Sequence, residues 1–424
     1  MLSSFPLTRR TGAVAVLGVL LAGAALAGGE ADAAGQARRG GGVVTKVADG
    51  DTPYVGGKKL SDRVRLLGVQ ATETSHGGVG KTWCHGGEAK TALAKLLVGK
   101  KVQLRSLRGG RAADGRWHRS VFRVDKGGRY LDVQAEMLRR GLVIWHPTND
   151  EWTYNRAYHV LADQAATARK RGTVWDDDWC GAGPSAGAKL RVWVNWDAEG
   201  DDSKNANGEY VVVKNDGPKG VPLGGWHVRD LSLQMYTFPR GAYLPPWGRV
   251  VLRVGKGRST ASTFYWGLSS PRFTNVGSAP GIGNGAYLLD PQGDFRAWFT
   301  YPCVVNCTDR LRGRIAITDV HYSPQLSGEY VRLRLSETAP RSSLDEYLLT
   351  SGSYTYRFPA GTYMNPGETL TVHVGPRPAG ATASRLEQYW GLPRRIFDKV
   401  GDSAALKTYR EVRVACRSYG SGRC

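Results

Sequence analysis

Beyond its first 27 residues the chain has no apolar run long enough to span a lipid bilayer. The one long run, residues 13–26, follows Arg9-Arg10 and ends in Ala25-Leu26-Ala27, which is the pattern of a cleaved export signal. A second small-residue cleavage pattern lies at residues 31–33, so we assign residues 1–33 to a signal peptide and processing region. The sequence predicts a secreted protein, either free outside the cell or associated with the cell wall, whose mature chain has no transmembrane segment.

Acidic residues are scarce relative to basic ones, with 37 Asp and Glu against 58 Lys and Arg, which gives a formal net charge of +21. Such an excess favours a polyanionic partner, because each neutralised phosphate releases condensed counterions. Nucleic acid, an anionic cell-wall polymer, or a simple need for solubility would each explain the charge. Charge alone does not choose among them.

The chain has no odd cysteine, because its six cysteines form an even set in an exported protein. That usage indicates disulfides rather than metal ligands. Position in the sequence suggests the pairs Cys84 with Cys180, Cys303 with Cys307, and Cys416 with Cys424. The alternative is a zinc ion bound by Cys84, His85 and His76, which an oxidising compartment disfavours.

Two short segments near the start of the mature chain carry groups that suit phosphodiester cleavage. Asp49 and Asp51 flank a glycine, so the chain can turn tightly and offer hard oxygen atoms to a cation of the calcium type. Arg65 lies in a short apolar strand, from which a guanidinium can form two hydrogen bonds to a phosphate. Glu73 follows closely and could accept a proton from an attacking water.

At these residues the chain resembles the staphylococcal nuclease family. The resemblance continues in order through the segments at residues 88–97, 102–104, 116–121, 133–142 and 154–175, and covers about residues 40–182. It implies a five-stranded OB-type barrel with helices, which hydrolyses DNA and RNA with the help of calcium.

The resemblance also implies roles for single residues. Asp51 corresponds to a calcium ligand, Asp49 to an outer or water-mediated one, and Glu73 to the general base. Arg65 corresponds to the first phosphate-binding arginine. For the second, Arg119 fits better than Arg116, because it leaves a shorter hairpin before the next segment.

One position departs from the family pattern. Gln70 stands where the family has a metal-binding aspartate, so one negative charge is lost from the site. The amide oxygen of Gln70 can still coordinate a hard cation, and the carbonyl oxygen of Ala71 can do so whatever its side chain, but calcium binding should weaken.

Two tryptophans are candidates for stacking on a nucleic-acid base. Trp117 and Trp145 lie near the expected cleft, although either could belong to the barrel core instead.

Residues 183–188 form a linker of small residues, and after it the chain repeats itself. Gly208-Glu209-Tyr210-Val211 recurs as Gly328-Glu329-Tyr330-Val331, and Tyr236 with Phe238 recurs as Tyr356 with Phe358, at an offset of 120. The alternating apolar pattern predicts two immunoglobulin-like β-sandwiches, at residues 189–302 and 313–424. Both resemble lamin-tail domains, the second less closely and with a disulfide-pinned tail.

An acidic loop lies in the first of these repeats. Asp197, Asp201 and Asp202, with Asn205 and Asn207, either bind calcium or form a hydrogen-bonded polar turn.

The fold class that we predict is mainly β with some α: an OB-fold-type nuclease barrel with helices, followed by two β-sandwiches. The predicted function is calcium-dependent endonuclease activity on DNA and RNA, with sandwiches that bind nucleic acid or the cell envelope. The alternative is a catalytically weakened or inactive binding protein, in which Gln70 marks a lost metal site.

Overall fold

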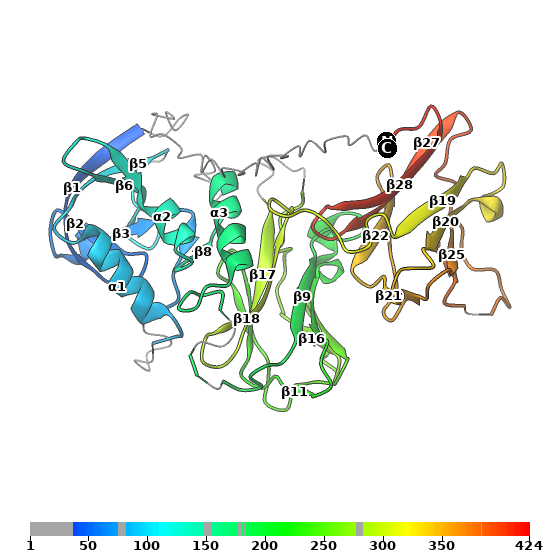
Figure 1. Ribbon diagram of the computed structural model, residues 1–424, viewed down its shortest axis with the longest axis horizontal. Helices are drawn as coiled ribbons and strands as arrows, with labels where there is room; N and C mark the ends of the chain where they lie inside the picture. Colours follow the sequence, from blue (N-terminus) through cyan, green and yellow to red (C-terminus); the bar gives the residue numbers. More distant parts are fainter. Residues whose placement is uncertain are drawn as a thin grey trace, which may run out of the picture.

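The computed structural model describes residues 37–74, 82–107, 109–147, 155–176, 180–181, 183–276, 283–382 and 384–424. The expected signal and processing region, as well as His76, therefore lie outside the described residues. Three bodies follow one another along the long axis of the molecule, in chain order from blue to red (Figure 1). Among the helices that the structure describes, none is long and apolar enough to cross a membrane.

The first body is a curled sheet flanked by three helices. Its strand order is β2-β1-β5-β6-β3, with β7 paired to β6. The bounds are β1 (Ala37–Val47), β2 (Pro53–Val55), β3 (Val64–Leu66), β5 (Lys101–Ser106), β6 (Trp117–Val124) and β7 (Tyr130–Asp132). The end strands β2 and β3 are joined only through an isolated bridge between Tyr54 and Arg63, so the expected barrel is curled but not closed.

The helices cover this sheet with apolar faces. They are α1 (Gly86–Leu97), α2 (Val133–Arg139) and α3 (Asn155–Ala168), and a small ribbon pairs β4 (Val69–Gln70) with β8 (Ile144–Trp145). In α1 the buried residues Ala89, Leu93 and Leu97 recur every four positions, which places them on one face of the helix. The carboxylate of Asp132 caps α2 by accepting a hydrogen bond from the amide of Ala135.

The second body is a sandwich of two four-stranded sheets. One sheet has the order β16-β15-β10-β9, the other β13-β12-β17-β18, and β11 pairs with β14. The bounds are β9 (Leu190–Asn195), β10 (Tyr210–Asn215), β11 (Val221–Pro222), β12 (His227–Asp230), β13 (Met235–Thr237), β14 (Tyr243–Leu244), β15 (Arg249–Arg253), β16 (Thr263–Tyr265), β17 (Asn284–Leu289) and β18 (Phe295–Tyr301).

The third body repeats that strand order. Its sheets are β19-β20-β25-β26 and β23-β22-β27-β28, with the ribbon β21-β24. The bounds are β19 (Ile315–His321), β20 (Tyr330–Leu335), β21 (Ser342–Ser343), β22 (Tyr347–Ser351), β23 (Tyr354–Arg357), β24 (Tyr363–Met364), β25 (Thr369–His373), β26 (Glu387–Tyr389), β27 (Gly401–Thr408) and β28 (Arg413–Gly420). Short 3-10 turns occur at η1 (Leu60–Asp62), η3 (Asp202–Lys204), η4 (Ala206–Gly208) and η5 (Leu326–Gly328).

The repeated Gly-Glu-Tyr-Val motif has a structural reason. Glu209 and Glu329 are both fully buried at the start of equivalent strands. Glu209 accepts hydrogen bonds from the amides of Arg272 and Phe273, and Glu329 accepts one from the amide of Ile396. Each glutamate therefore holds the long loop that closes its own sandwich.

The three bodies share their cores. Leu231, Tyr287, Leu289 and Phe295 of the first sandwich belong to the hydrophobic core of the nuclease-like body. Leu348 and Tyr409 of the second sandwich belong in turn to the core of the first. The segment at residues 183–188, expected to be a linker, is tied down as well, because Arg296 donates to the carbonyl oxygens of Pro184 and Ser185.

Candidate active site

The turn between β1 and β2 places Asp51 at the centre of a buried polar cluster. A side chain at Gly50 would put its Cβ 2.5 Å from the Cβ of Ala89 and 2.7 Å from that of Ala71, so only glycine lets the turn approach so closely. One carboxylate oxygen of Asp51 accepts the amide of Ala71 at 2.7 Å and lies 3.0 Å from Nη1 of Arg65. Asp51 and Arg65 are 3 % and 6 % exposed, so their ion pair is well shielded from water.

Asp49 supports this turn. Its Oδ1 accepts the amide of Asp51 at 3.0 Å. Burial, together with the neighbouring charge of Asp51, raises the pKa of Asp49 above its usual range. A nearby cation would relieve that cost, which is consistent with an outer role for Asp49 at a metal site.

Gln70 joins Arg65 to Glu73. Its Oε1 accepts a hydrogen bond from Nη2 of Arg65, while its Nε2 donates to the carbonyl oxygen of Ala71 at 2.7 Å and to Oε1 of Glu73 at 3.0 Å. The amide nitrogen thus brings the positive end of a dipole to the Ala71 carbonyl oxygen, one of the oxygen atoms that a cation would otherwise bind.

The remaining oxygen donors can hold a calcium-type ion only after a local change. Asp51 and the Ala71 carbonyl supply hard oxygen atoms. Gln70 would have to turn its amide about, which would break its bond to Arg65 and set two donors against each other. The residues present therefore fit a divalent cation less well than an aspartate at position 70 would.

A groove of about 370 Å³ adjoins this cluster and is rich in basic residues. Arg65, Arg116 and Arg119 all line it. The guanidinium of Arg119 is buried and donates to the carbonyl oxygens of His118 and Gly109, each at 2.7 Å. That of Arg116 is 28 % exposed and pairs with Asp114 at 2.8 Å. Arg116 is therefore the more accessible of the two candidates, while the hydrogen bonds of Arg119 serve the fold.

The two tryptophans lie in different surroundings. Trp117 is half-buried near the groove, with the guanidinium carbons of Arg111 and Arg119 at 4.3 Å and 4.9 Å from its ring centroids. Trp145 is fully buried and stacks on His159 at 4.0 Å. The expectation that Trp145 binds substrate is therefore corrected: it is a core residue.

One wall of the groove comes from the first sandwich, which sequence reasoning missed. Leu233, in the turn between β12 and β13, lines the groove together with His146. The ring nitrogen Nδ1 of His146 lies 2.5 Å from the carbonyl oxygen of Leu231. Burial, with the charge of Arg65, lowers the pKa of His146 to about 4, so its ring is neutral near pH 7 and Nδ1 can donate this bond.

Arg229 also reaches the cluster from β12. It is 6 % exposed, and burial lowers its pKa while the nearby charge of Glu73 opposes that change. Arg229 is therefore a further arginine close enough for the charge of Glu73 to act on it. No signal in the sequence marks it, because its approach depends on how the two bodies dock.

The acidic loop of the first sandwich forms a polar turn. Asp202 accepts the amide of Ala198 at 3.0 Å and the side chain of Asn275 at 2.6 Å, and Asn205 donates to the carbonyl of Glu199. These oxygens serve hydrogen bonds within the fold.

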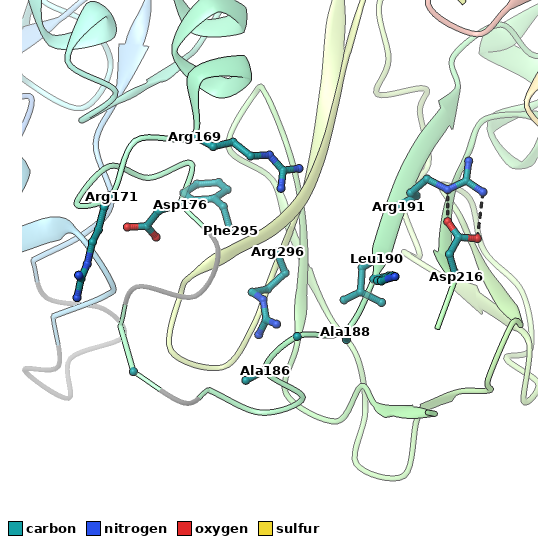
Figure 2. A pocket seen from close by; sticks show the side chains of 13 residues that line it. Arg169, Arg171, Asp176, Ala186, Ala188, Leu190, Arg191, Asp216, Phe295 and Arg296 are labelled. Carbon is teal, nitrogen blue, oxygen red and sulfur yellow. Dashed lines mark hydrogen bonds and ion pairs between the residues drawn. The ribbon is translucent and has the colours of Figure 1, made fainter. Parts of the chain in front are cut away.

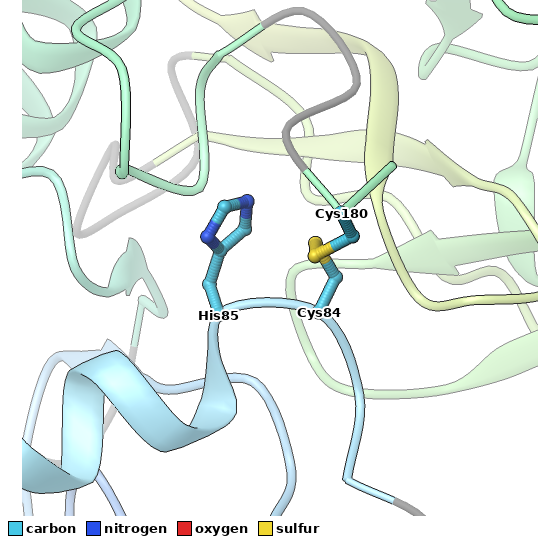
Figure 3. A group of neighbouring side chains, drawn as sticks. All are labelled: Cys84, His85 and Cys180. Atoms are coloured by element: carbon cyan, nitrogen blue, oxygen red, sulfur yellow. A yellow bond between two sulfur atoms is a disulfide. The ribbon is translucent and has the colours of Figure 1, made fainter. Parts of the chain in front are cut away.

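All six cysteines form disulfides in the predicted pairs, Cys84–Cys180, Cys303–Cys307 and Cys416–Cys424. The sulfur of Cys84 is thereby consumed, which removes the zinc alternative that depended on it. His85 lies beside this disulfide (Figure 3).

Comparison with known proteins assigns the first two bodies. Residues 63–177 match the family model "Staphylococcal nuclease homologue", and residues 186–303 match "Lamin Tail Domain". The chain thus carries a staphylococcal nuclease-like domain followed by a lamin tail domain, as the motifs predicted. The first match includes Arg65, Gln70 and Glu73 but begins after Asp49 and Asp51. None of the curated proteins matches the chain.

Proposed function

We propose that the protein is a secreted, metal-assisted endonuclease that hydrolyses phosphodiester bonds of DNA and RNA. The observation that carries this proposal is the continuous chain of contacts from Asp51 through Arg65 and Gln70 to Glu73, next to a groove lined by arginines. A nuclease-like family and a strongly basic chain both support a nucleic-acid substrate.

The residues divide the work of the reaction. Arg65 and Arg116 bind the phosphate and stabilise the charge that builds on it, and Arg119 holds the loop that forms the rim. Glu73 accepts the proton of the attacking water. The side-chain amide of Gln70 holds the carboxylate of Glu73 in place. Asp51 and the Ala71 carbonyl, with Asp49 as an outer partner, would hold a divalent cation of the calcium class, which would supply Lewis-acid polarisation of a phosphoryl oxygen.

The two sandwiches would concentrate the enzyme on its polymer. Nucleic acid is the substrate that we favour, and an anionic cell-wall polymer is the second polyanion consistent with the net charge of +21.

A second function deserves a test because of Gln70. Its amide nitrogen donates to the Ala71 carbonyl oxygen that a cation would need, which favours a binding protein that has lost its metal site. Such a protein would hold nucleic acid without cutting it.

The deciding experiment measures cleavage of single-stranded DNA, double-stranded DNA and RNA by the mature protein, in calcium or in chelator. We expect calcium-stimulated cutting that Glu73→Gln abolishes. Tight binding without cutting in any condition would establish the binding protein instead. Cutting that Glu73→Gln leaves intact would show that the assigned base is wrong.

A further inference from the structure

Apart from the groove at the candidate active site, the structure has a cavity that leads to a group of buried side chains, two of which have no hydrogen-bond partner. It measures about 1080 Å³ and lies where the nuclease-like domain meets the first sandwich. Arg169, Arg171 and Asp176 of the one, and Phe295 and Arg296 of the other, line it (Figure 2). Asp176 connects this cavity to the buried group, because its carboxylate also approaches the ring of His85.

His85, Asp176 and Asp294 meet at this junction. Nε2 of His85 lies 3.6 Å from Oδ1 of Asp176 and 3.7 Å from Oδ1 of Asp294. One possible ligand atom from each residue lies within 4.8 Å of the other two. The side chains of His85 and Asp294 are 0 % exposed and that of Asp176 is 7 % exposed, so water screens the group very little.

The polar atoms of this group lack the bonds that burial normally requires. Both ring nitrogens of His85 and both carboxylate oxygens of Asp294 have no hydrogen-bond partner. Leaving such atoms buried and unsatisfied destabilises the fold, and most of all where the group is charged. Two orphaned side chains that face each other need a common partner.

The spacing suits a metal ion better than direct hydrogen bonds. At 3.6 Å and 3.7 Å the nitrogen–oxygen separations exceed hydrogen-bond length. Ligands placed tetrahedrally at about 2.0–2.1 Å from a zinc ion lie about 3.4 Å from one another. One imidazole and two carboxylates form a ligand set that zinc accepts, with a fourth position for water.

The backbone holds these side chains in place from both domains. His85 has a left-handed φ of 64° at the start of α1, a conformation that costs a histidine energy and that clusters at ligand sites. The amide of Cys84 donates to the carbonyl of Gln292 at 3.0 Å. Gly293 allows the turn to approach Trp83, because a Cβ there would lie 2.6 Å from the indole. The β17–β18 turn is thus docked directly against residues 83–85.

We propose that His85, Asp176 and Asp294 bind a divalent transition-metal ion of the zinc class, which fastens the lamin tail domain to the nuclease-like domain. The ion reaches the site through the cavity that Asp176 lines. It is separate from any calcium at Asp51, and it stabilises the docked arrangement whether or not the protein cuts nucleic acid.

The test starts from the full mature protein stripped with chelator. Zinc is titrated by calorimetry, bound metal is counted by mass spectrometry, and the melting temperature is followed with and without zinc. Cobalt serves as a coloured substitute that reports the ligand geometry. We expect one zinc per chain and a melting temperature that rises with zinc, because the ion binds only the folded state.

Matched variants locate the ion. Asp294→Asn and His85→Gln should each weaken zinc binding by at least about tenfold, the lower end of the loss typical for residues that only support a ligand. Asp51→Asn, at the candidate active site, should keep full zinc binding, as should His159→Phe, which alters another buried histidine.

Absence of zinc and cobalt binding by the stripped parent protein would overturn the proposal, even if both ligand variants failed to fold. Unchanged zinc affinity in Asp294→Asn would also overturn it. So would zinc binding lost in Asp51→Asn but kept in His85→Gln, because the ion would then belong to the nuclease site.

Discussion

At the scale of single residues, Gln70 decides how the candidate active site uses a cation. Its amide nitrogen satisfies the Ala71 carbonyl and Glu73 without any metal. An aspartate in its place would set a second carboxylate beside Glu73, and that repulsion disappears only when a cation binds.

Gln70→Asp should therefore make the protein more dependent on calcium. We expect calcium to raise the melting temperature of the variant more than that of the parent, and calcium-stimulated cleavage to increase. Thermal melts and cleavage assays in calcium and in chelator measure both effects. The neutral Gln70→Asn variant is the control, and an equal calcium response in all three proteins would refute this view of the site.

Three of the groove arginines, Arg65, Arg116 and Arg119, should differ in the kind of defect that their loss causes. Arg65→Ala should lower kcat by about 100- to 1000-fold, as the loss of a group that stabilises transition-state charge does. Arg116→Ala should mainly raise KM, because its guanidinium is accessible. Arg119→Ala should lower stability, because the partly buried carbonyl oxygens of Gly109 and Gly110 lose their donor.

Steady-state kinetics and denaturant unfolding of the same three variants make the comparison. Should Arg119→Ala abolish turnover while unfolding like the parent, Arg119 is the second phosphate-binding arginine after all.

The buried ring of His159 should make the folded protein less stable in acid. Burial, and then the charges of Arg410 and Arg156, lower its pKa to about 3, and the carboxylate of Asp163 lies 3.7 Å from its Nε2. Since the unfolded chain titrates near pH 6.5, the contribution of neutral His159 is complete above that pH. It is lost as the pH falls toward 3, at up to about 1.4 kcal/mol per pH unit.

Unfolding free energies measured between pH 7.5 and pH 4 test this point. His159→Phe keeps the stacking on Trp145 but cannot titrate, so its stability should fall less steeply with acid. A variant of the half-buried His373 serves as the control and should follow the parent. Identical slopes for the parent and His159→Phe would contradict the prediction.

At the scale of elements, the β12–β13 turn matters because it borders the nuclease groove. Leu233 is 37 % exposed at that border. Leu233→Lys should tighten binding of DNA and steepen its dependence on salt by nearly one counterion, whereas Leu233→Glu should weaken binding.

Binding isotherms at several salt concentrations measure these slopes. Val400→Lys, at a residue that is 72 % exposed on the second sandwich, adds the same charge elsewhere and should change the slope less. If both lysine variants behave alike, the turn does not border the nucleic-acid path.

The sequence predicts those parts of the site that one short stretch of chain carries. Asp51, Arg65, Gln70 and Glu73 lie close in sequence, so their order already indicates their chemistry. The pairs Cys303–Cys307 and Cys416–Cys424 followed from their short spacing, whereas Cys84 and Cys180, which are 96 residues apart, were paired because both lie in the nuclease-like domain. The hairpin length favoured Arg119 over Arg116, but the sequence could not predict that Arg119 is buried and bound to backbone carbonyls while Arg116 stays partly exposed.

Contacts between domains could not be predicted from the sequence, for a different reason. The charge of Glu73 acts on Arg229, and His85 approaches Asp294, only because two domains dock in one particular orientation. No local pattern encodes that orientation. The repeat at an offset of 120 did predict the second sandwich, since its apolar alternation and turns recur in register with the first.

At the scale of the whole molecule, the lamin tail domain completes the nuclease-like domain. Trp175 packs against Tyr287, Phe295 and Trp298, with ring centroids 5.0–6.0 Å apart. Each large apolar side chain buried in this way contributes about 1.5–3 kcal/mol.

A fragment that ends at residue 181 should therefore melt at least about 10 °C below the full protein or fail to fold, given about 2–4 °C per kcal/mol. A fragment that ends at residue 302 should lose less. It gives up the contacts of Leu348 and Tyr409 and the ion pair of Asp163 with Arg410. Calorimetry of the two fragments compares them, and a stable, fully active fragment ending at 181 would refute the shared core.

The tethered segment between Pro184 and Ala188 bears on how the protein would resist proteases if it is secreted, as we propose. Extracellular proteases preferentially cut loops between domains, and such a cut normally separates an enzyme from its anchoring module. Here Arg296 holds this segment, and apolar packing joins the two domains on either side of it. A nicked molecule should remain in one piece, so this protein would keep its enzyme and its attachment together even after its chain has been broken.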